Sequence, residues 1–250
     1  MRGSLLVMAK APVPGLAKTR LAKVVGDEAA AALAAAALLD TLEAGGRAWP
    51  RGRRVLALAG DLTKAVRERD IRSSAADWHV VAQGGGSFAE RLVDGHRQAH
   101  RLAGGPVVQV GMDTPQADAH LLRGLADEAH RHDGPVLGPA LDGGWWVLVT
   151  THPHQARVLA GVPMSRSDTG RLTAAALRAA GHPPLAAPPL RDVDEVEDAH
   201  AVAAQAPHTR FAALWRSLEV PGAADPPTPP AVPAASADPA PADPAPGGHG

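Results

Sequence analysis

The chain has 250 residues, 45% of them hydrophobic, which is enough to bury the core of one large α/β domain or two small ones. Its formal net charge of −1 argues against a general nucleic-acid binder, and its lack of cysteine excludes disulfides, thiolate zinc sites, iron–sulfur clusters and a cysteine nucleophile. The apolar run near the N-terminus, Leu5–Met8, is too short for a secretory or membrane segment, so we expect a cytoplasmic protein without membrane insertion.

Strand-like and helix-like segments alternate along most of the chain. Short apolar runs predict strands at Ser4–Met8, Arg54–Ala59, Trp78–Ala82, Pro106–Val110, Val136–Gly138 and Trp145–Thr150. Longer segments predict helices at Asp27–Ala44, from Asp61 to about Asp70, and at Ser87–Leu102, Gln116–His130, Pro153–Ala160, Gly170–Ala180, Glu195–Gln205 and Thr209–Leu218. Gly45 and Gly46 are expected to end the first of these helices.

Strands that alternate with helices of this length imply right-handed βαβ units and a parallel sheet covered on both faces. We therefore expect a single three-layer α/β/α domain over residues 1–220 with a mostly parallel central sheet. Residues 221–250 consist almost only of Pro, Ala, Asp and Gly. Such a segment cannot bury enough apolar surface to offset the entropy lost on ordering, so a disordered Pro/Ala-rich tail is predicted there.

A basic loop, Lys10–Arg20, follows the first predicted strand. In open parallel sheets ligands bind beyond the carboxyl ends of the strands, which is where this loop lies. Lys10, Lys18 and Arg20 could neutralise a di- or triphosphate, and Gly15 allows the backbone a turn or a close approach to a ligand. The loop contains no Walker A motif, and a solvated basic loop before a helix is the alternative interpretation.

Carboxylates follow later segments that should reach the same edge of the sheet. Asp113, at the end of a central strand, is well placed to hold Mg²⁺ or Mn²⁺ together with substrate phosphates; alternatively it caps the next helix or forms a turn before Pro115. Farther along, Asp192 or Asp194 could give the same metal a second carboxylate, unless these acids merely favour the N-terminus of the following helix.

Asp142 lies in an Asp-Gly-Gly turn directly before Trp145 and Trp146, although a plain turn is the simpler interpretation of that sequence. On a strand the two indoles point to opposite faces. One is therefore expected to pack in the core while the other stacks on a ring at the cleft.

Together these segments resemble one family, the bacterial nucleotide-diphospho-sugar transferase-like proteins known as domain of unknown function 2064. The family belongs to the glycosyltransferase-A superfamily, which also contains nucleotidyltransferases. The resemblance covers about residues 4–205 and is carried, in order, by Lys10–Leu21, Gln83–Leu92, Gly111–Pro115, Gly138–Trp146 and Asp192–Asp198. Three segments depart from the family pattern. Ser87 replaces the usual Asp, and the acids of Asp192–Asp198 are offset from the family's spacing. Met164-Ser-Arg-Ser replaces Trp-Ser-Thr, so the family's acceptor contacts are not carried over to that segment.

With the resemblance, we expect a glycosyltransferase-A-like, Rossmann-related fold and a nucleotide or nucleotide-sugar as ligand. The expected nucleotide-binding residues are Lys10, Ala11, Pro14, Gly15, Lys18, Arg20, Gln83 and Arg91. Mg²⁺ or Mn²⁺ is expected at Asp113 and Asp194, and catalytic roles at Lys18, Asp113 and Asp142. The expected substrate contacts are Asp142, Gly143, Gly144 and Trp145.

Two reactions fit these residues. In the favoured one, glycosyl transfer, an NDP-sugar lies against the basic loop, a metal on Asp113 stabilises the leaving NDP, and Asp142 is a possible general base for a small-molecule acceptor. In nucleotidyl transfer, a phosphate or phosphonate acceptor attacks the α-phosphorus of an NTP, and the basic loop stabilises departing pyrophosphate. A third hypothesis is a non-catalytic nucleotide-binding protein, supported by the departures at Ser87 and Met164.

Overall fold

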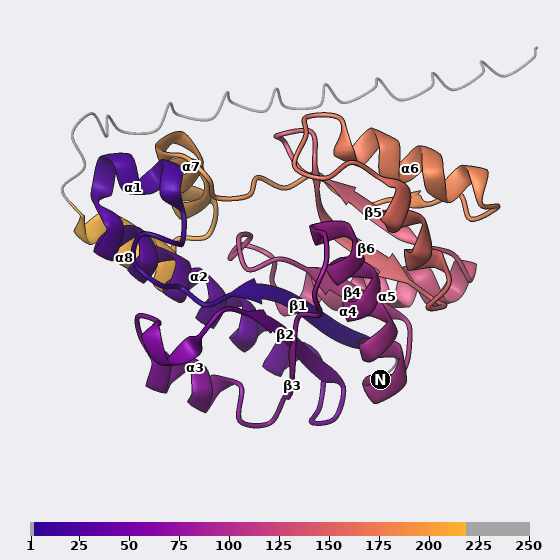
Figure 1. Ribbon diagram of the computed structural model, residues 1–250, viewed down its shortest axis with the longest axis horizontal. Coiled ribbons are helices and arrows are strands. Elements are labelled where there is room, and N and C mark those ends of the chain that lie inside the picture. The colour runs from indigo at the N-terminus through magenta and orange to yellow at the C-terminus, as the bar shows by residue number, and fades with distance from the viewer. Residues whose placement is uncertain (1–2, 219–250) are drawn as a thin grey trace, which may run out of the picture.

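A computed structural model describes residues 3–218, and a seven-stranded sheet runs through them in the order β3-β2-β1-β4-β6-β5-β7 (Figure 1). The strands are β1 (Ser4–Lys10), β2 (Arg54–Ala59), β3 (His79–Ala82), β4 (Val107–Val110), β5 (Val136–Pro139), β6 (Trp145–Thr150) and β7 (Leu185–Ala186). The predicted tail, residues 221–250, and the last two residues of the predicted domain lie outside the described residues.

Six of the strands are parallel to at least one neighbouring strand, and β6 alone is antiparallel to both of its neighbours. β1 pairs in parallel with β2 and β4, β2 with β3, and β5 with β7, whereas β6 is antiparallel to β4 and to β5. The expected mostly parallel sheet is confirmed. The exception follows from chain length, because residues 140–144 between β5 and β6 are too few for the crossover that a parallel pair needs.

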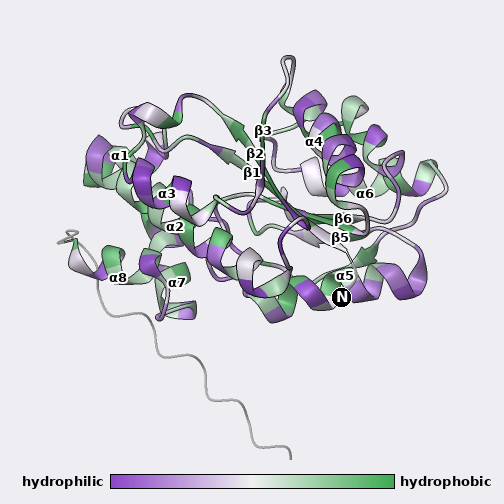
Figure 2. Cartoon of the chain, turned by 90° about the horizontal axis from the view of Figure 1, so that it is seen from below, coloured by the Kyte–Doolittle hydropathy of each residue, from purple (hydrophilic) through white to green (hydrophobic). Residues whose placement is uncertain are grey.

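Helices cover both faces of the sheet. The helices are α1 (Thr19–Val25), α2 (Asp27–Ala48), α3 (Glu68–Ser74), α4 (Phe88–Ala103), α5 (Ala119–His132), α6 (Thr169–Ala179), α7 (Val196–Gln205) and α8 (Arg210–Ser217), with 3-10 turns η1 (Leu62–Lys64) and η2 (Gln155–Gly161). On β1, Leu5 and Val7 pack with α2 and α5, and Leu6 and Met8 pack with α4 and η2 on the other face. Figure 2 shows α2 and α5 on one side of the sheet and α4 on the other. The expected three-layer α/β/α fold is confirmed.

Helix α2 continues through Gly45 and Gly46 to Ala48, so the predicted stop at these glycines is wrong. A Cβ atom at Gly45 would stand 2.5 Å from Leu5 Cδ2 and 2.6 Å from the Trp78 ring. Glycine at this position therefore lets the helix lie close on the sheet. Among residues 3–218, α2 alone is long and apolar enough to cross a membrane, and 72% of its apolar window is buried, as in the core helix of an ordinary α/β fold.

Three smaller features differ from the predicted elements. The basic loop leads directly into α1, which the sequence did not predict, and β7 was likewise missed. The polar helix expected from Asp61 to about Asp70 is instead the turn η1, whose first N–H groups are capped by Asp61, followed by α3. Pairing of this kind between a short polar side chain and the backbone competes with helix formation.

Candidate active site

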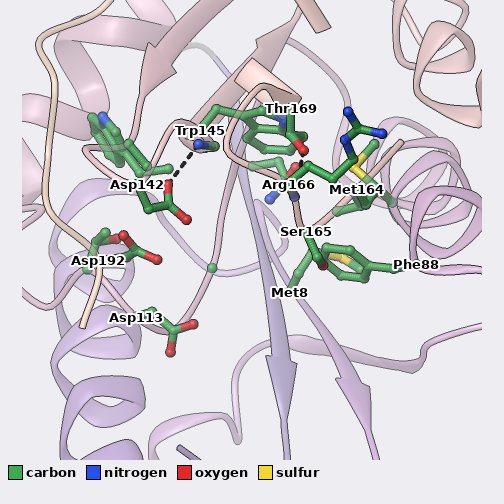
Figure 3. Close-up of a pocket in the computed structure, with 17 residues that line it drawn as sticks. Met8, Phe88, Asp113, Asp142, Trp145, Met164, Ser165, Arg166, Thr169 and Asp192 are labelled. Carbon is green, nitrogen blue, oxygen red and sulfur yellow. Dashed lines mark hydrogen bonds between the residues drawn. The ribbon is translucent and has the colours of Figure 1, made fainter. Parts of the chain in front are cut away.

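A cavity of about 320 Å³ lies beyond the carboxyl ends of β1 and β4 and beside the β5–β6 turn (Figure 3). Asp113, Asp142 and Asp192 line it from three separate segments. A second cavity of about 300 Å³ shares Asp142 and Asp192 with the first and is lined on its other side by Arg20 and Asp194. We call the two cavities together the cleft. Its position is the one that an open sheet of mostly parallel strands predicts for a ligand.

Lys18 of the basic loop lies against Asp113, with its Nζ 2.7 Å from Asp113 Oδ1. The ammonium group also donates a hydrogen bond to the carbonyl oxygen of Val193, and only 11% of the side chain is exposed. Lys18 has a left-handed backbone (φ 49°), which begins α1 and turns the side chain inward. Asp113 does not cap the next helix, because Asp118 accepts the hydrogen bond from Leu121 N at the start of α5. The cation and carboxylate that the sequence singled out are therefore in contact.

The other cations of the basic loop are more exposed. Arg20 pairs with Asp194 at 3.0 Å and with Glu195 at 3.5 Å, and Lys10 Nζ donates to the carbonyl oxygen of Leu16. Carboxylates and carbonyls hold the groups that were expected to bind phosphate. Lys18 and Arg20 thus already have the geometry for anionic oxygens, since both hold carboxylates through charge-assisted contacts.

Of the two alternatives for a second cleft carboxylate, Asp192 lies with Asp113 and Asp142, whereas Asp194 lies at the mouth beside Arg20. Burial and, to a lesser extent, the nearby charge of Asp142 together raise the pKa of Asp192 to about 6. Asp142 is exposed, and its Oδ1 accepts a hydrogen bond from Gly144 N at 2.7 Å. The metal role expected of Asp194 stays a prediction.

The donor set of the cleft fits a hard divalent cation that is shared with a ligand. Within residues 3–218, no group of three or more acidic or histidine side chains is arranged to hold a metal by itself. Three carboxylates nevertheless line one cavity, and the pKa of Asp192 is raised first by its burial and then by the negative charges of Asp142 and Asp113. Mg²⁺ and Mn²⁺ take carboxylate oxygens and complete their shells with waters or substrate phosphates. Asp113 and Asp192 are therefore the residues suited to hold such an ion together with a phosphate.

The two tryptophans take the opposite orientations that a strand requires. Trp146 is buried, and its indole N–H donates to the carbonyl oxygen of Pro188 at 2.9 Å. Trp145 lines the cavity instead, and its buried indole nitrogen has no hydrogen-bond partner in the described part of the chain. One indole thus belongs to the core and the other to the cleft, as expected.

Gly143 and Gly144 hold the β5–β6 turn against the segment before α6. Gly143 has a φ of 89°, and a Cβ atom there would stand 1.9 Å from the carbonyl oxygen of Ser167. The N–H of Gly170 donates to the carbonyl oxygen of Gly143 at 2.9 Å. Only glycine allows this approach, so the Asp-Gly-Gly turn brings residues 164–169 to the wall of the cavity.

Of the predicted nucleotide-binding residues, Arg20 alone is among the residues that line the two cavities; Lys18 reaches them through its contact with Asp113. Gln83 donates to the carbonyl oxygens of Ala9 and Ala57 at 2.9 and 3.0 Å, so its side chain ties neighbouring strand ends together. The Arg91 guanidinium lies over the Phe88 ring, 5.6 Å from its centre. Ala11 is buried, while Pro14 and Gly15 lie at the tip of the basic loop. Their nucleotide roles stay predictions.

The sequence did not predict the apolar wall of the cavity. Met8, Phe88, Leu92 and Met164 line it opposite the carboxylates, and Phe88 is 43% exposed. The sequence predicts the helix α4, but it does not indicate which side chains in its first turns face the cleft. The one available signal was the departure from the family pattern at Met164, which lies in this wall.

Comparisons with known proteins agree with this fold. The model of the family described as "Uncharacterized protein conserved in bacteria (DUF2064)" matches residues 42–166. No protein with a curated description matches the chain in sequence.

Three solved structures have similar folds. A protein from Desulfovibrio desulfuricans G20, provisionally named a nucleotide-diphospho-sugar transferase, is 25% identical over 86% of this chain and 95% of its own, with a TM-score of 0.72. A 4-diphosphocytidyl-2C-methyl-D-erythritol synthase is 14% identical over 82% of this chain and 98% of its own (TM-score 0.54). A cytidylyltransferase from Leptospira borgpetersenii serovar Hardjo-bovis (strain JB197) is 13% identical over 86% of this chain and 93% of its own (TM-score 0.52). The last two likenesses concern the fold alone.

Proposed function

The chain belongs to the bacterial family with domain of unknown function 2064, and from that premise we propose that it is a metal-dependent glycosyltransferase. Its similar structures are transferases that use nucleotides, so a nucleotide-utilising transferase is the general class. The donor in this proposal is an NDP-sugar, and the acceptor is a small molecule bound in the cavity.

The phosphate end of the cleft supports a diphosphate ligand. Lys18 and Arg20 are each held by carboxylates from other segments, namely Asp113, Asp194 and Glu195. A diphosphate offers the same type of oxygen with more charge, so it can replace these carboxylates on the two cations. Release of Asp113 from Lys18 leaves a free carboxylate beside the phosphates. When bound there, Mg²⁺ or Mn²⁺ supplies charge neutralisation for the leaving NDP.

The acidic end supports removal of a proton from a hydroxyl group. Asp142 is the expected base, and it lines the same cavity as Asp192, the carboxylate suited to the metal. The acceptor hydroxyl gives its proton to Asp142, and its oxygen forms a bond to the anomeric carbon. The bond from that carbon to the phosphate oxygen breaks, and its electron pair leaves with NDP. Lys18 and Arg20 stabilise the charge that develops on this leaving group.

The observation that favours glycosyl over nucleotidyl transfer is the charge of the cavity wall. Its charged residues are Asp113, Asp142 and Asp192 against Arg166, which is itself paired with Asp168. A phosphorylated acceptor brings about two further negative charges. At an effective dielectric of about 20, two like unit charges about 6 Å apart repel by about 3 kcal/mol. A neutral hydroxyl acceptor avoids this repulsion.

Nucleotidyl transfer remains the second candidate because the fold is also that of cytidylyltransferases and because three cations lie in the basic loop. A non-catalytic nucleotide-binding protein is the third. The three hypotheses share the phosphate site and differ in what is released after the nucleotide binds.

Calorimetric titration with a panel of NDP-sugars and NTPs, with and without Mg²⁺ or Mn²⁺, tests the phosphate site. We expect Lys18→Met to weaken binding by about 10- to 100-fold, because hydrogen bonds to charged groups contribute about 1.5–3 kcal/mol. Lys23→Met is the matched control, since Lys23 lies in the last turn of α1 and is exposed. Asp113→Asn should abolish the metal dependence. Equal binding by the Lys18 and Lys23 variants would contradict the assignment.

A further inference from the structure

The end of the cavity away from the carboxylates is apolar. Met8 comes from β1, Phe88 and Leu92 from the first turns of α4, Trp145 from β6 and Met164 from the segment before α6 (Figure 3). These side chains gather from four separate segments. The neighbouring carboxylates have roles in catalysis or metal binding, and neither role requires an apolar wall of this extent.

Three residues that line the same cavity have a polar atom without a partner. The hydroxyl of Thr114, the side-chain oxygen of Gln109 and the indole nitrogen of Trp145 are buried, and none has a hydrogen-bond partner among residues 3–218. Thr114 and Gln109 as a whole are 4% and 3% exposed. Buried polar groups in folded proteins are nearly always hydrogen-bonded, so unpaired polar atoms around a cavity point to a ligand that supplies the partners. An indole N–H only donates, and the ligand atom facing Trp145 must therefore be an acceptor such as an oxygen.

The apolar end has little positive charge to offer. Arg166 is the one cation that lines the cavity within the described chain, and its guanidinium points away from the three carboxylates (Figure 3). Asp168 holds it at 3.0 Å and also holds Arg171 at 3.2 Å. A phosphate or carboxylate placed against Trp145 would have no free cation and would face Asp142 on the other side.

We propose that this end of the cavity binds the acceptor, and that the acceptor is a neutral alcohol or phenol with a compact apolar body. The proposal rests on the glycosyl transfer proposed above and names the substrate class of the same site. The apolar body packs on Met8, Phe88, Leu92 and Met164, and an oxygen accepts the Trp145 hydrogen bond. The volume of about 320 Å³ is near the lower end of the roughly 300–1,000 Å³ that small-molecule sites occupy, which favours a compact ligand.

The indole N–H signals of the full-length protein in a ¹H–¹⁵N correlation spectrum provide a direct test. The chain has five tryptophans, and a Trp145→Phe variant identifies the signal of Trp145. Three small probes of different chemistry are titrated separately: benzyl alcohol, methyl glucoside and glycerol 3-phosphate. We expect saturable movement of the Trp145 signal with benzyl alcohol at concentrations at least tenfold lower than with the other two. The signals of Trp146 and Trp215 should not move, because Pro188 and His200 hold their indole N–H groups.

Variants then locate the binding surface. Met164→Ala and Phe88→Ala should each raise the dissociation constant of benzyl alcohol at least fivefold. Leu141→Ala is the matched control, because Leu141 is 57% exposed and lines the second cavity only. The proposal is wrong if glycerol 3-phosphate binds more tightly than benzyl alcohol, if all three probes move the signal alike, or if none moves it. Should benzyl alcohol bind as expected while no NDP-sugar binds, the glycosyltransferase assignment fails and the chemistry of the apolar end stands.

Discussion

The charge of Asp192 lowers the free energy of unfolding, and replacing this residue with a neutral one should stabilise the protein. Burial and the neighbouring Asp142 raise its pKa from 3.8 to about 6. The difference of about two pKa units corresponds to about 3 kcal/mol at 1.36 kcal/mol per unit. Asp192 is only partly buried, so solvent screening reduces this value, and we expect a net cost of about 1 kcal/mol above pH 6.

The sign of the effect depends on pH. Because the pKa of the folded state is raised, the folded chain binds the proton more tightly than the unfolded chain between pH 3.8 and about 6. The free energy of unfolding therefore falls as the pH rises through this window, and the whole cost is present above it. Asp192→Asn removes the charge and should raise the free energy of unfolding by about 1 kcal/mol at pH 7.5, with little gain at pH 4.

Urea denaturation of the wild type and the variant at the two pH values, in the presence of a metal chelator, measures this difference. In a separate thermal denaturation at pH 7.5, the melting temperature of the variant should lie about 3 °C above that of the wild type, as expected for about 1 kcal/mol in a domain of this size. Asp194→Asn is the matched control, because Asp194 pairs with Arg20 at the surface and should give no gain. A gain of equal size at both pH values, or a loss at pH 7.5, would refute the reasoning. A stabilising loss of charge is typical of residues retained for function.

Two further predictions concern packing and acid stability. Gly45→Ala should destabilise the fold by about 1–3 kcal/mol through overpacking. At Gly46 the atom nearest to an added Cβ is the end of the Arg54 side chain, at 3.3 Å, so Gly46→Ala should stabilise α2 by up to about 1 kcal/mol. Chemical denaturation of the two variants measures these opposite changes in the free energy of unfolding. His96 is fully buried, and burial lowers its pKa to about 3, so the unfolded chain takes up a proton first as the pH falls from 6.5. A His96→Gln variant should therefore lose stability less steeply between pH 6 and 4, by at most about 1.4 kcal/mol per pH unit; an unchanged slope in urea titrations would exclude this role.

The strand-end positions of the site could be predicted because they follow from local sequence. A buried apolar run followed by Asp113 places that carboxylate at the sheet edge in any parallel arrangement, and the same holds for the basic loop after β1. The pairing of Lys18 with Asp113 then follows from the adjacency of β1 and β4. The antiparallel β6 was also within reach, because five residues between two strands exclude a parallel crossover.

Other features depended on tertiary contacts that no local pattern reports. Gly45 and Gly46 are a stop signal in sequence, yet the contact of Gly45 with Leu5 and Trp78 keeps the helix intact. Asp192 and Asp194 are equivalent in sequence, and only the folded chain shows that Asp192 enters the cavity while Asp194 pairs with Arg20. The apolar wall of the cavity likewise brings together side chains that lie up to 156 positions apart, from Met8 to Met164.

The central claim, transfer of a sugar from an NDP-sugar to a neutral hydroxyl, is tested most directly by identifying the phosphorus product. Phosphorus-31 NMR follows a panel of NDP-sugars and NTPs incubated with the protein, Mg²⁺ or Mn²⁺, benzyl alcohol and pooled cell metabolites. We predict release of NDP from one of the NDP-sugars, dependent on metal and abolished in Asp113→Asn. Release of pyrophosphate from an NTP would contradict the claim and establish nucleotidyl transfer, and saturable binding without either product would establish a nucleotide-binding protein.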